Sequence, residues 1–369
     1  MDVLFVGWDA ATEKHLSRFD LPFWESLPHG GGLLPQYPFD KAGYISSANA
    51  WTTLSTGASF EEHGMLGFVY EPYSEHPASN LITKIATQQW LPPLLRRIMI
   101  GRVLGTVGSG EKGSKGEKID STDIEFKRVW EYLEGDGLIY GLPLTYPTWE
   151  TNGVMVSGIP APKPSEASSP VVYPSEYEEF VYDDEDVGYY VDVNSPVNDS
   201  SVAEEPYCAA HQTRMGANAR KYIELYEETE SDHDFEFGFL MLRGLDDIMH
   251  ATTDMDILEE SYELIDTLTA DVVEAIDPDA TLVLSDHGMR PASDYRFDKD
   301  MRMDHDTRQG VWAATEPLDL ERHLDVVPAL LEYLGVEEVV PQDRGVVDLV
   351  MSESDRGAVQ ERLEDLGYA

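Results

Sequence analysis

A hydroxyl-rich stretch from Ser46 to Gly57 could supply the nucleophile of a group-transfer reaction. Its small residues let the backbone come close to a ligand, and the helical pattern that follows would offer the unpaired N–H groups of a helix start to an anion. A serine or threonine attacks only where a neighbouring group lowers the pKa of its hydroxyl. The stretch contains no histidine or lysine, so the activating groups must come from elsewhere in the chain.

Carboxylates and imidazoles that could activate this hydroxyl follow separate apolar segments. Asp246 and His250 are four residues apart, so one face of a helix could present both to one ion. Asp286 and His287 are adjacent and could share an ion where a strand breaks into a turn. Mixed carboxylate and imidazole ligands suit Zn, with Mn as the alternative. The complete set of candidate ligands is Asp9, Asp246, His250, Asp286, His287 and His305.

The evidence for Asp9 is weaker, and some further histidines have no ligand pattern at all. Asp9 alone could equally cap the turn that follows its strand. Three further histidines fit no ligand pattern, and we expect them at surface or structural positions: His211, His233 and His323.

Alternating apolar runs must position these side chains. Strand patterns cover 3–7, 138–142, 153–158, 235–242, 281–285 and 311–314, and helical patterns cover 48–56, 126–133, 209–230, 257–276 and 325–335. This alternation predicts an α/β fold with a mostly parallel central sheet and helices on both faces. Ligands of such sheets gather at the carboxyl ends of the strands, where the candidate residues fall. His305 is expected in a loop just before the strand at 311–314.

Two stretches read as additions to this core. Between 91 and 118 there are six basic residues and two acidic ones, which favours a packing helix and a mobile loop over a lid or docking site for an anionic or amphiphilic substrate. From 171 to 207 there are eleven acidic residues and no Lys or Arg, which indicates a solvated surface excursion.

The charge of the chain limits its partners. With 70 Asp and Glu against 26 Lys and Arg, the net charge of −44 would repel nucleic acid and anionic membranes. We interpret the spread of acidic residues as adaptation to a salt-rich cytoplasm, with an acidic mesophilic protein as the alternative.

Cys208 is the single cysteine, so no intramolecular disulfide can form. The first residues lack the shape of a signal peptide and no apolar run could span a membrane, so we expect a cytoplasmic protein. The oligomeric state is left open.

The order of these motifs resembles the type I phosphodiesterase and nucleotide pyrophosphatase family of the alkaline phosphatase superfamily, especially its archaeal and haloarchaeal members. The resemblance implies one alkaline-phosphatase-like catalytic domain over residues 1–369, with cap or loop insertions at about 70–125 and 165–205. The pieces that carry it are Gly7-Trp8-Asp9, the hydroxyl stretch with His63-Gly64, Gly141 to Gly158, Asp246-x-x-x-His250, Asp286-His287-Gly288, His305 before Gly310, and Asp325-Val326-Val327-Pro328.

Carried onto this chain, the resemblance implies two divalent metal ions and a nucleophile at Ser47. One ion would be held by Asp9, Ser47, Asp286 and His287, and the other by Asp246, His250 and His305. Thr52 and Thr53 would instead point into the helix packing or back to a carbonyl. Asn49 and Phe68 would lie on the substrate side.

Two departures from the family pattern bear on specificity. Phe68 stands where nucleotide pyrophosphatases have an Asn that contacts the phosphoryl group, and Gly310 follows His305 with one residue more than the pattern has. The implied activity is hydrolysis of a small phosphoric ester, of the diester or nucleotide pyrophosphate type, through a phosphorylated Ser47. The alternatives are a phosphomonoesterase, phosphonate hydrolase or phosphotransferase, and a non-catalytic protein that keeps the fold.

Overall fold

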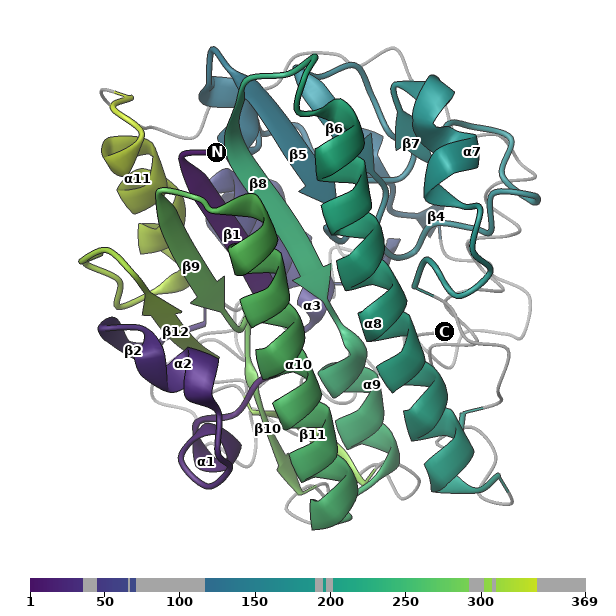
Figure 1. Cartoon of the computed structure of the whole chain (residues 1–369), viewed down its shortest axis with the longest axis vertical. Coiled ribbons are helices and arrows are strands. Elements are labelled where there is room, and N and C mark those ends of the chain that lie inside the picture. The colour runs from purple at the N-terminus through teal and green to yellow at the C-terminus, as the bar shows by residue number, and fades with distance from the viewer. Residues whose placement is uncertain are drawn as a thin grey trace, which may run out of the picture.

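An eight-stranded sheet forms the centre of the molecule (Figure 1). The computed structural model describes residues 1–35, 45–65, 67–70, 117–189, 195–196, 202–291, 302–306 and 310–336. In spatial order the strands are β2 (His29–Leu33), β12 (Gly310–Ala314), β9 (Ala280–Leu284), β1 (Val3–Trp8), β8 (Phe235–Leu242), β5 (Asp136–Tyr140), β6 (Gly153–Val156) and β7 (Val172–Tyr173).

The middle of this sheet is parallel, as predicted. Strands β9, β1, β8, β5 and β6 pair in parallel, with β1 between β9 and β8. The edges are antiparallel: β12 pairs with β9 and β2 on one side, and β7 pairs with β6 on the other. The carboxyl ends of β9, β1 and β8 therefore lie next to one another at one edge of the sheet.

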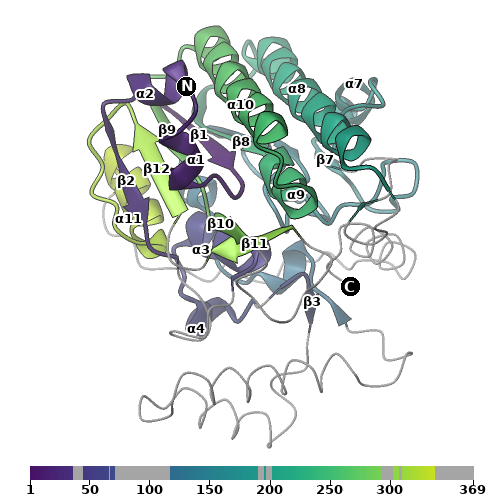
Figure 2. The same ribbon diagram turned by 90° about the horizontal axis from the view of Figure 1, so that it is seen from below.

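Helices cover both faces of the sheet (Figure 2). Long helices α8 (Glu204–Thr229) and α10 (Met255–Ile276) pack side by side on one face, while α3 (Ser47–Thr56) and α11 (His323–Tyr333) pack together on the other. Alternate residues of β1 serve the two layers. Leu4, Val6 and Trp8 belong to the apolar core beneath α8 and α10. Val3 and Phe5 belong to the second core, with α3 and α11.

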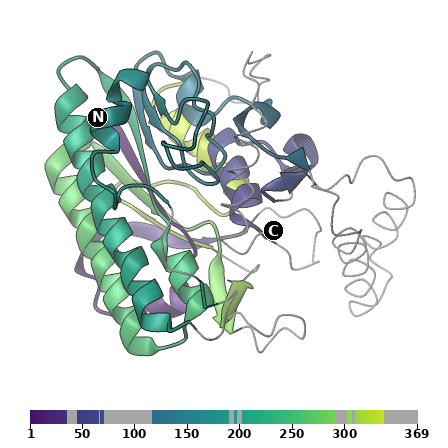
Figure 3. The same ribbon diagram turned by 90° about the vertical axis from the view of Figure 1, so that its right-hand side faces the viewer.

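Short elements complete the described chain. The helices are α1 (Glu13–Leu16), α2 (Pro22–Ser26), α4 (Phe60–His63), α7 (Glu178–Val181) and α9 (Gly244–Ala251), with 3-10 turns at Ser121–Asp123, Val129–Tyr132 and Ser175–Tyr177. Two small antiparallel pairs are β3 (Val69–Tyr70) with β4 (Glu117–Lys118), and β10 (Gly288–Pro291) with β11 (Met303–Asp306). Helix α9 and the β10–β11 pair lie where the central strands end (Figures 1 and 3).

Several local predictions differ from the structure. The helix predicted over 126–133 is only a 3-10 turn, and the acidic stretch 171–207 is not a surface excursion throughout, because Val172 and Val181 are buried in the core. His305 lies on strand β11 rather than in a loop, because residues Met303–Asp306 pair with β10. Of the basic stretch 91–118, all but its last two residues lie outside the described residues. In the described part of the chain, none of the helices combines the length and apolar character needed to cross a bilayer.

Candidate active site

Three buried aspartates meet at the carboxyl edge of the sheet. Asp9 directly follows β1, Asp286 follows β9 within two residues, and Asp246 lies in the first turn of α9, which begins just after β8. All three side chains are completely buried. The adjacency of β9, β1 and β8 therefore brings together carboxylates that are far apart in the sequence, as predicted from the strand ends.

His287 joins Asp9 and Asp286 in one ligand group. Its Nε2 atom lies 3.3 Å from Asp286 Oδ2 and 3.7 Å from Asp9 Oδ1. One ligand atom from each of these residues lies within 4.8 Å of the others, a spacing at which one ion could touch all of them. The other Asp286 oxygen, Oδ1, accepts a hydrogen bond from the Ala10 N–H at 3.2 Å, which fixes the plane of the carboxylate.

His250 and His305 surround Asp246 on the other side. Helix α9 presents Asp246 and His250 four residues apart on one face, and β11 brings His305 to the same carboxylate oxygen. Asp246 Oδ1 is 3.4 Å from His250 Nε2 and 3.3 Å from His305 Nε2. Asp246, His305 and His287 form a second group of ligand atoms within 4.8 Å, so His287 lies between the two groups.

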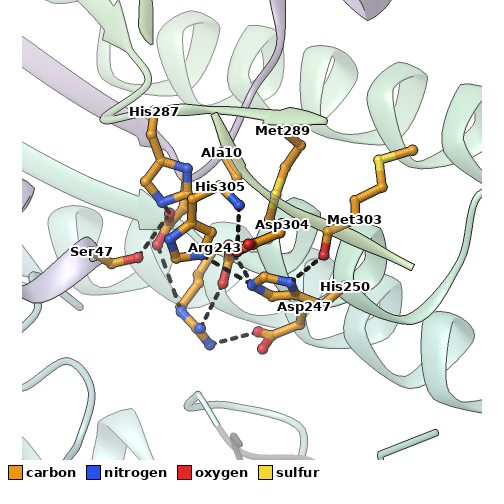
Figure 4. Close-up of polar contacts among 12 residues, drawn as sticks. Ala10, Ser47, Arg243, Asp247, His250, His287, Met289, Met303, Asp304 and His305 are labelled. Atoms are coloured by element: carbon orange, nitrogen blue, oxygen red, sulfur yellow. Dashed lines mark hydrogen bonds and ion pairs between the residues drawn. The ribbon is translucent and has the colours of Figure 1, made fainter. Parts of the chain in front are cut away.

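The three imidazoles are oriented alike by the backbone. The Nδ1 atoms of His250, His287 and His305 hydrogen-bond to the carbonyls of Met303, Gly288 and Ile45 at 3.0, 3.2 and 2.9 Å. A carbonyl can only accept, so each Nδ1 donates this hydrogen bond and each ring turns its Nε2 atom toward the carboxylates. This is the arrangement in which histidine binds a metal, with the second nitrogen held by an outer partner. Figure 4 shows the three rings in a row.

Ser47 reaches the first ligand group from the start of α3. Ser46 is the N-cap, and its hydroxyl accepts the Asn49 N–H at 3.2 Å, so Ser47 is the first helical residue. Ser47 Oγ donates to Asp9 Oδ1 at 3.3 Å. The helix can approach β1 closely because Gly7 has no side chain: a Cβ atom there would lie 2.7 Å from the Trp51 ring.

The neighbouring hydroxyls are committed to other partners. Thr52 donates to the Ala48 carbonyl at 2.7 Å and Ser55 to the Trp51 carbonyl at 2.6 Å, as expected for hydroxyls that bond back within a helix. Thr53 Oγ1 hydrogen-bonds to His63 Nε2 at 3.0 Å. Among the hydrogen bonds described for the hydroxyls of α3, that of Ser47 is the one that reaches a candidate metal ligand.

Burial sets the protonation of the ligands in the absence of an ion. Desolvation, followed by repulsion from Asp286 and Asp246, raises the pKa of Asp9 well above its ordinary value. Desolvation also raises the pKa of Asp286 to about 7, although its hydrogen bond with Asp9 opposes the rise. Burial also opposes the charge of Asp246, but His250, His305 and Arg243 outweigh it and hold the Asp246 pKa well below normal. Desolvation works against protonation of His305 as well, yet its hydrogen bond to Asp246 raises the His305 pKa to about 9. A bound cation would therefore favour ionisation of Asp9 and Asp286 in this dry space.

The residues present fit divalent metal ions. Among the described residues, Asp286 Oδ2 and His287 Nε2 are buried without a hydrogen-bond partner, although both are strong polar groups. Carboxylate oxygens and imidazole Nε2 atoms are the ligands that zinc and related ions use.

Arg243 is the site residue that the sequence patterns did not reveal. It lies between β8 and α9, as the N-cap of that helix, and contacts three aspartates, namely Asp9, Asp246 and Asp247. A signal was present, because Arg243 precedes Asp246 and Asp247 by three and four residues, the spacing of neighbours on a helix face.

The remaining predicted residues take varied places. Asn49 is buried and donates to the Met65 carbonyl at 3.0 Å, and Phe68 is buried just before β3. His211 and His323 are buried and structural, as expected, and His233 pairs with Asp136 at 2.9 Å near the amino end of β8.

Comparison with known proteins defines the family. Residues 45–324 match the family described as type I phosphodiesterase / nucleotide pyrophosphatase. This match spans most of the sequence and includes every candidate ligand except Asp9. The chain belongs to that family. No curated protein sequence matches it closely enough to count as a relative.

Solved structures with a similar course of the chain are remote in sequence. Murine ectonucleotide pyrophosphatase / phosphodiesterase 5 is 12% identical with a TM-score of 0.49, over 93% of this chain and 97% of that one. The alkaline phosphatase of the Antarctic bacterium TAB5 is 11% identical with a TM-score of 0.44, over 91% and 99%. Phosphonoacetate hydrolase from Sinorhizobium meliloti is 14% identical with a TM-score of 0.40, over 79% and 56%. These likenesses are too distant to argue about activity.

Proposed function

We propose that this protein is a metal-dependent hydrolase of small phosphoric esters that works through a phosphorylated Ser47. The observation that carries the proposal is the convergence of the Ser47 hydroxyl with three aspartates and three histidines, all buried or half-buried, at one edge of the sheet. Membership of the type I phosphodiesterase family supports the same reaction class.

The proposed ligand sets follow the two sides of the site. Asp9, Asp286, His287 and Ser47 would hold one ion, and Asp246, His250 and His305 the other. Two such ions lower the pKa of an attacking hydroxyl and stabilise the charge on the attacking and leaving oxygens. We favour zinc because imidazole and carboxylate ligands are mixed here, with manganese as the alternative.

The chain itself supplies the nucleophile and its orientation. The Ser47 hydroxyl donates a hydrogen bond to Asp9 Oδ1 at 3.3 Å, which directs the Ser47 oxygen toward the first ligand group. The N–H groups at the start of α3 follow Ser47 directly and are suited to hold phosphoryl oxygens. In-line attack by Ser47 Oγ on phosphorus would form the serine phosphate and release the alcohol, and water would then return the serine and inorganic or esterified phosphate.

For the substrate we favour a diester over a monoester. The family supports diesters, and Phe68 in place of a polar residue supports a bulky or apolar group near the phosphoryl site. The same geometry would serve a phosphomonoesterase, phosphonate hydrolase or phosphotransferase. We further propose a single catalytic domain, with insertions near 70–125 and 165–205, working in a salt-rich cytoplasm, as the net charge of −44 supports.

The nucleophile is tested by Ser47→Ala with Ser46→Ala as its neighbour control. Ser47→Ala should abolish the serine phosphate and reduce turnover by orders of magnitude while the fold and most metal affinity remain. Ser46→Ala removes the N-cap bond to Asn49 and should cost only about 1 kcal/mol of stability. A trapped phosphopeptide that maps to Ser46 or Thr52 would refute the assignment, and full activity of Ser47→Ala would refute the mechanism.

The substrate class is tested with a panel in molar KCl, with Zn and Mn added separately. The panel comprises phosphodiesters, nucleotide pyrophosphates, phosphomonoesters, phosphonates and a sulfate ester. Diesters should be cleaved fastest. If monoesters are cleaved much faster than every diester, the subclass is wrong although the reaction class stands.

A further inference from the structure

Arg243 contacts one carboxylate from each of the two ligand groups. Its side chain is only 2% exposed. Nη2 donates to Asp246 Oδ2 at 2.9 Å, and Nε lies 3.6 Å from Asp9 Oδ2. Asp9 belongs to the group with Asp286, and Asp246 to the group with His305, so one guanidinium spans both.

The two oxygens of each carboxylate have different neighbours. Oδ1 of Asp246 faces His250 and His305, while Oδ2 of the same residue faces Arg243. Asp9 repeats the pattern, because Oδ1 faces Ser47 and His287 and Oδ2 faces Arg243. Arg243 thus donates a hydrogen bond to Oδ2 of Asp246 and forms an ion pair with Oδ2 of Asp9, while Oδ1 of each carboxylate is turned toward the imidazoles.

Asp247 holds the guanidinium in this place. Asp247 Oδ2 accepts from Arg243 Nη1 at 2.7 Å and lies 3.4 Å from His211 Nδ1 on α8. Asp247 is not part of either ligand group. The planar fork of arginine places donors on three separate nitrogens at fixed angles, whereas the donors of lysine all lie on one rotatable nitrogen.

We propose that Arg243 is a positioning residue that fixes Asp9 and Asp246 relative to one another, and that it thereby sets the affinity of both metal sites together. The proposal rests on the proposed function, since it assumes that these carboxylates bind metal. Outer partners of metal ligands commonly contribute 10- to 100-fold to metal affinity, so about that loss is expected at each site when Arg243 is removed.

A role as a simple counter-ion predicts the opposite sign. A cation that only neutralises the carboxylates competes with the metal, so removing it would tighten metal binding, and lysine would replace it fully. A positioning role predicts that Arg243→Gln weakens binding at both sites and that Arg243→Lys restores little of the loss.

The experiment measures the number of Zn²⁺ ions bound and their dissociation constants by competition with a chelator in the purified full chain. Arg243→Gln should weaken both sites by about 10- to 100-fold. Asp247→Asn keeps the shape of the anchor and Arg243 itself, and should weaken both sites together by less. Arg214→Gln is the matched control, because Arg214 bonds the carbonyls of Glu185 and Val187 and pairs with Asp186, none of which is a candidate ligand.

The outcomes distinguish failure of the proposed function from failure of the positioning role. If the unaltered protein binds no Zn²⁺, the proposed function fails and this inference fails with it. If it binds two ions and Arg243→Gln binds both as tightly or more tightly, the positioning role is overturned while the function stands. Should Arg243→Gln not fold, an Asp247→Asn protein with unchanged affinity at both sites overturns the role equally.

Discussion

Lowering the pH should destabilise the metal-free protein partly through His63, the last residue of α4. This ring is 7% exposed and joins α3 to the following loop, since Nδ1 accepts the Met65 N–H at 3.0 Å and Nε2 hydrogen-bonds to Thr53 Oγ1. Burial, helped by the nearby Arg128, lowers the pKa of His63 to about 3. A second proton would have to go on Nδ1, where the Met65 N–H already points.

The sign follows from proton linkage. The folded pKa lies below the unfolded value of about 6.5, so between pH 6.5 and about 3 the unfolded chain binds the extra proton and the folded chain does not. The stability associated with His63 is therefore complete above pH 6.5 and decreases as the pH falls through that window. At pH 5 the loss relative to pH 8 amounts to about 2 kcal/mol for this one histidine.

Denaturant unfolding of the chelator-treated protein from pH 8 to pH 5 measures this loss. His63→Gln should remove about 2 kcal/mol of the pH dependence in that range. Thr53→Val is the control, because it deletes the hydroxyl partner and lowers stability at every pH but keeps the imidazole that titrates. Equal pH slopes for His63→Gln and the unaltered protein would refute the reasoning, because the comparison cancels all other titrating groups.

Two further outcomes follow from the site and the surface. His250→Ala should reduce the bound ions from two to one, because it removes a ligand beside Asp246 and leaves the Asp9–Asp286 group intact; elemental analysis checks this, with His233→Ala as the control remote from the site. An unchanged count of ions would contradict the proposed division of ligands. The melting temperature should rise from dilute buffer to molar KCl, since the screening length falls from about 10 Å to about 3 Å and weakens repulsion within a chain of net charge −44. A melting temperature that stays level or falls would contradict salt adaptation and would leave the proposed enzymatic function unaffected.

The central sheet could be predicted because its strands are long apolar runs that end in polar residues. Val3–Trp8, Phe235–Leu242 and Ala280–Leu284 all have this form, and the structure places them side by side. Strand β2 could not be predicted, because its sequence His-Gly-Gly-Gly-Leu has no preference for a strand. It forms by pairing with β12, where a Cβ on Gly30 would lie 2.7 Å from the Trp312 carbonyl.

The residues that form the candidate site could be predicted from the sequence, but their positions relative to one another could be predicted only in part. Strand ends indicate that Asp9 and Asp286 meet, since parallel neighbours end at one edge. The strand position of His305 depends on pairing between β11 and β10, which the isolated segment Met303–Asp306 does not signal. The contact of Arg243 with Asp9 is of the same kind, because it joins two segments that only the folded sheet brings together.

The pairing of β1 has a consequence for folding during synthesis. Val3 pairs with Phe237 and Ala280, so the strand of this sheet that is synthesised before the others lies in its middle and gains its partners only when β8 and β9 have been synthesised. Until then a wholly apolar strand waits without its neighbours, a state prone to aggregation. Pairings this distant along the chain also fold slowly. We therefore expect the nascent protein to depend on chaperones for most of its translation, and truncated chains that stop before β9 to be recovered as aggregates.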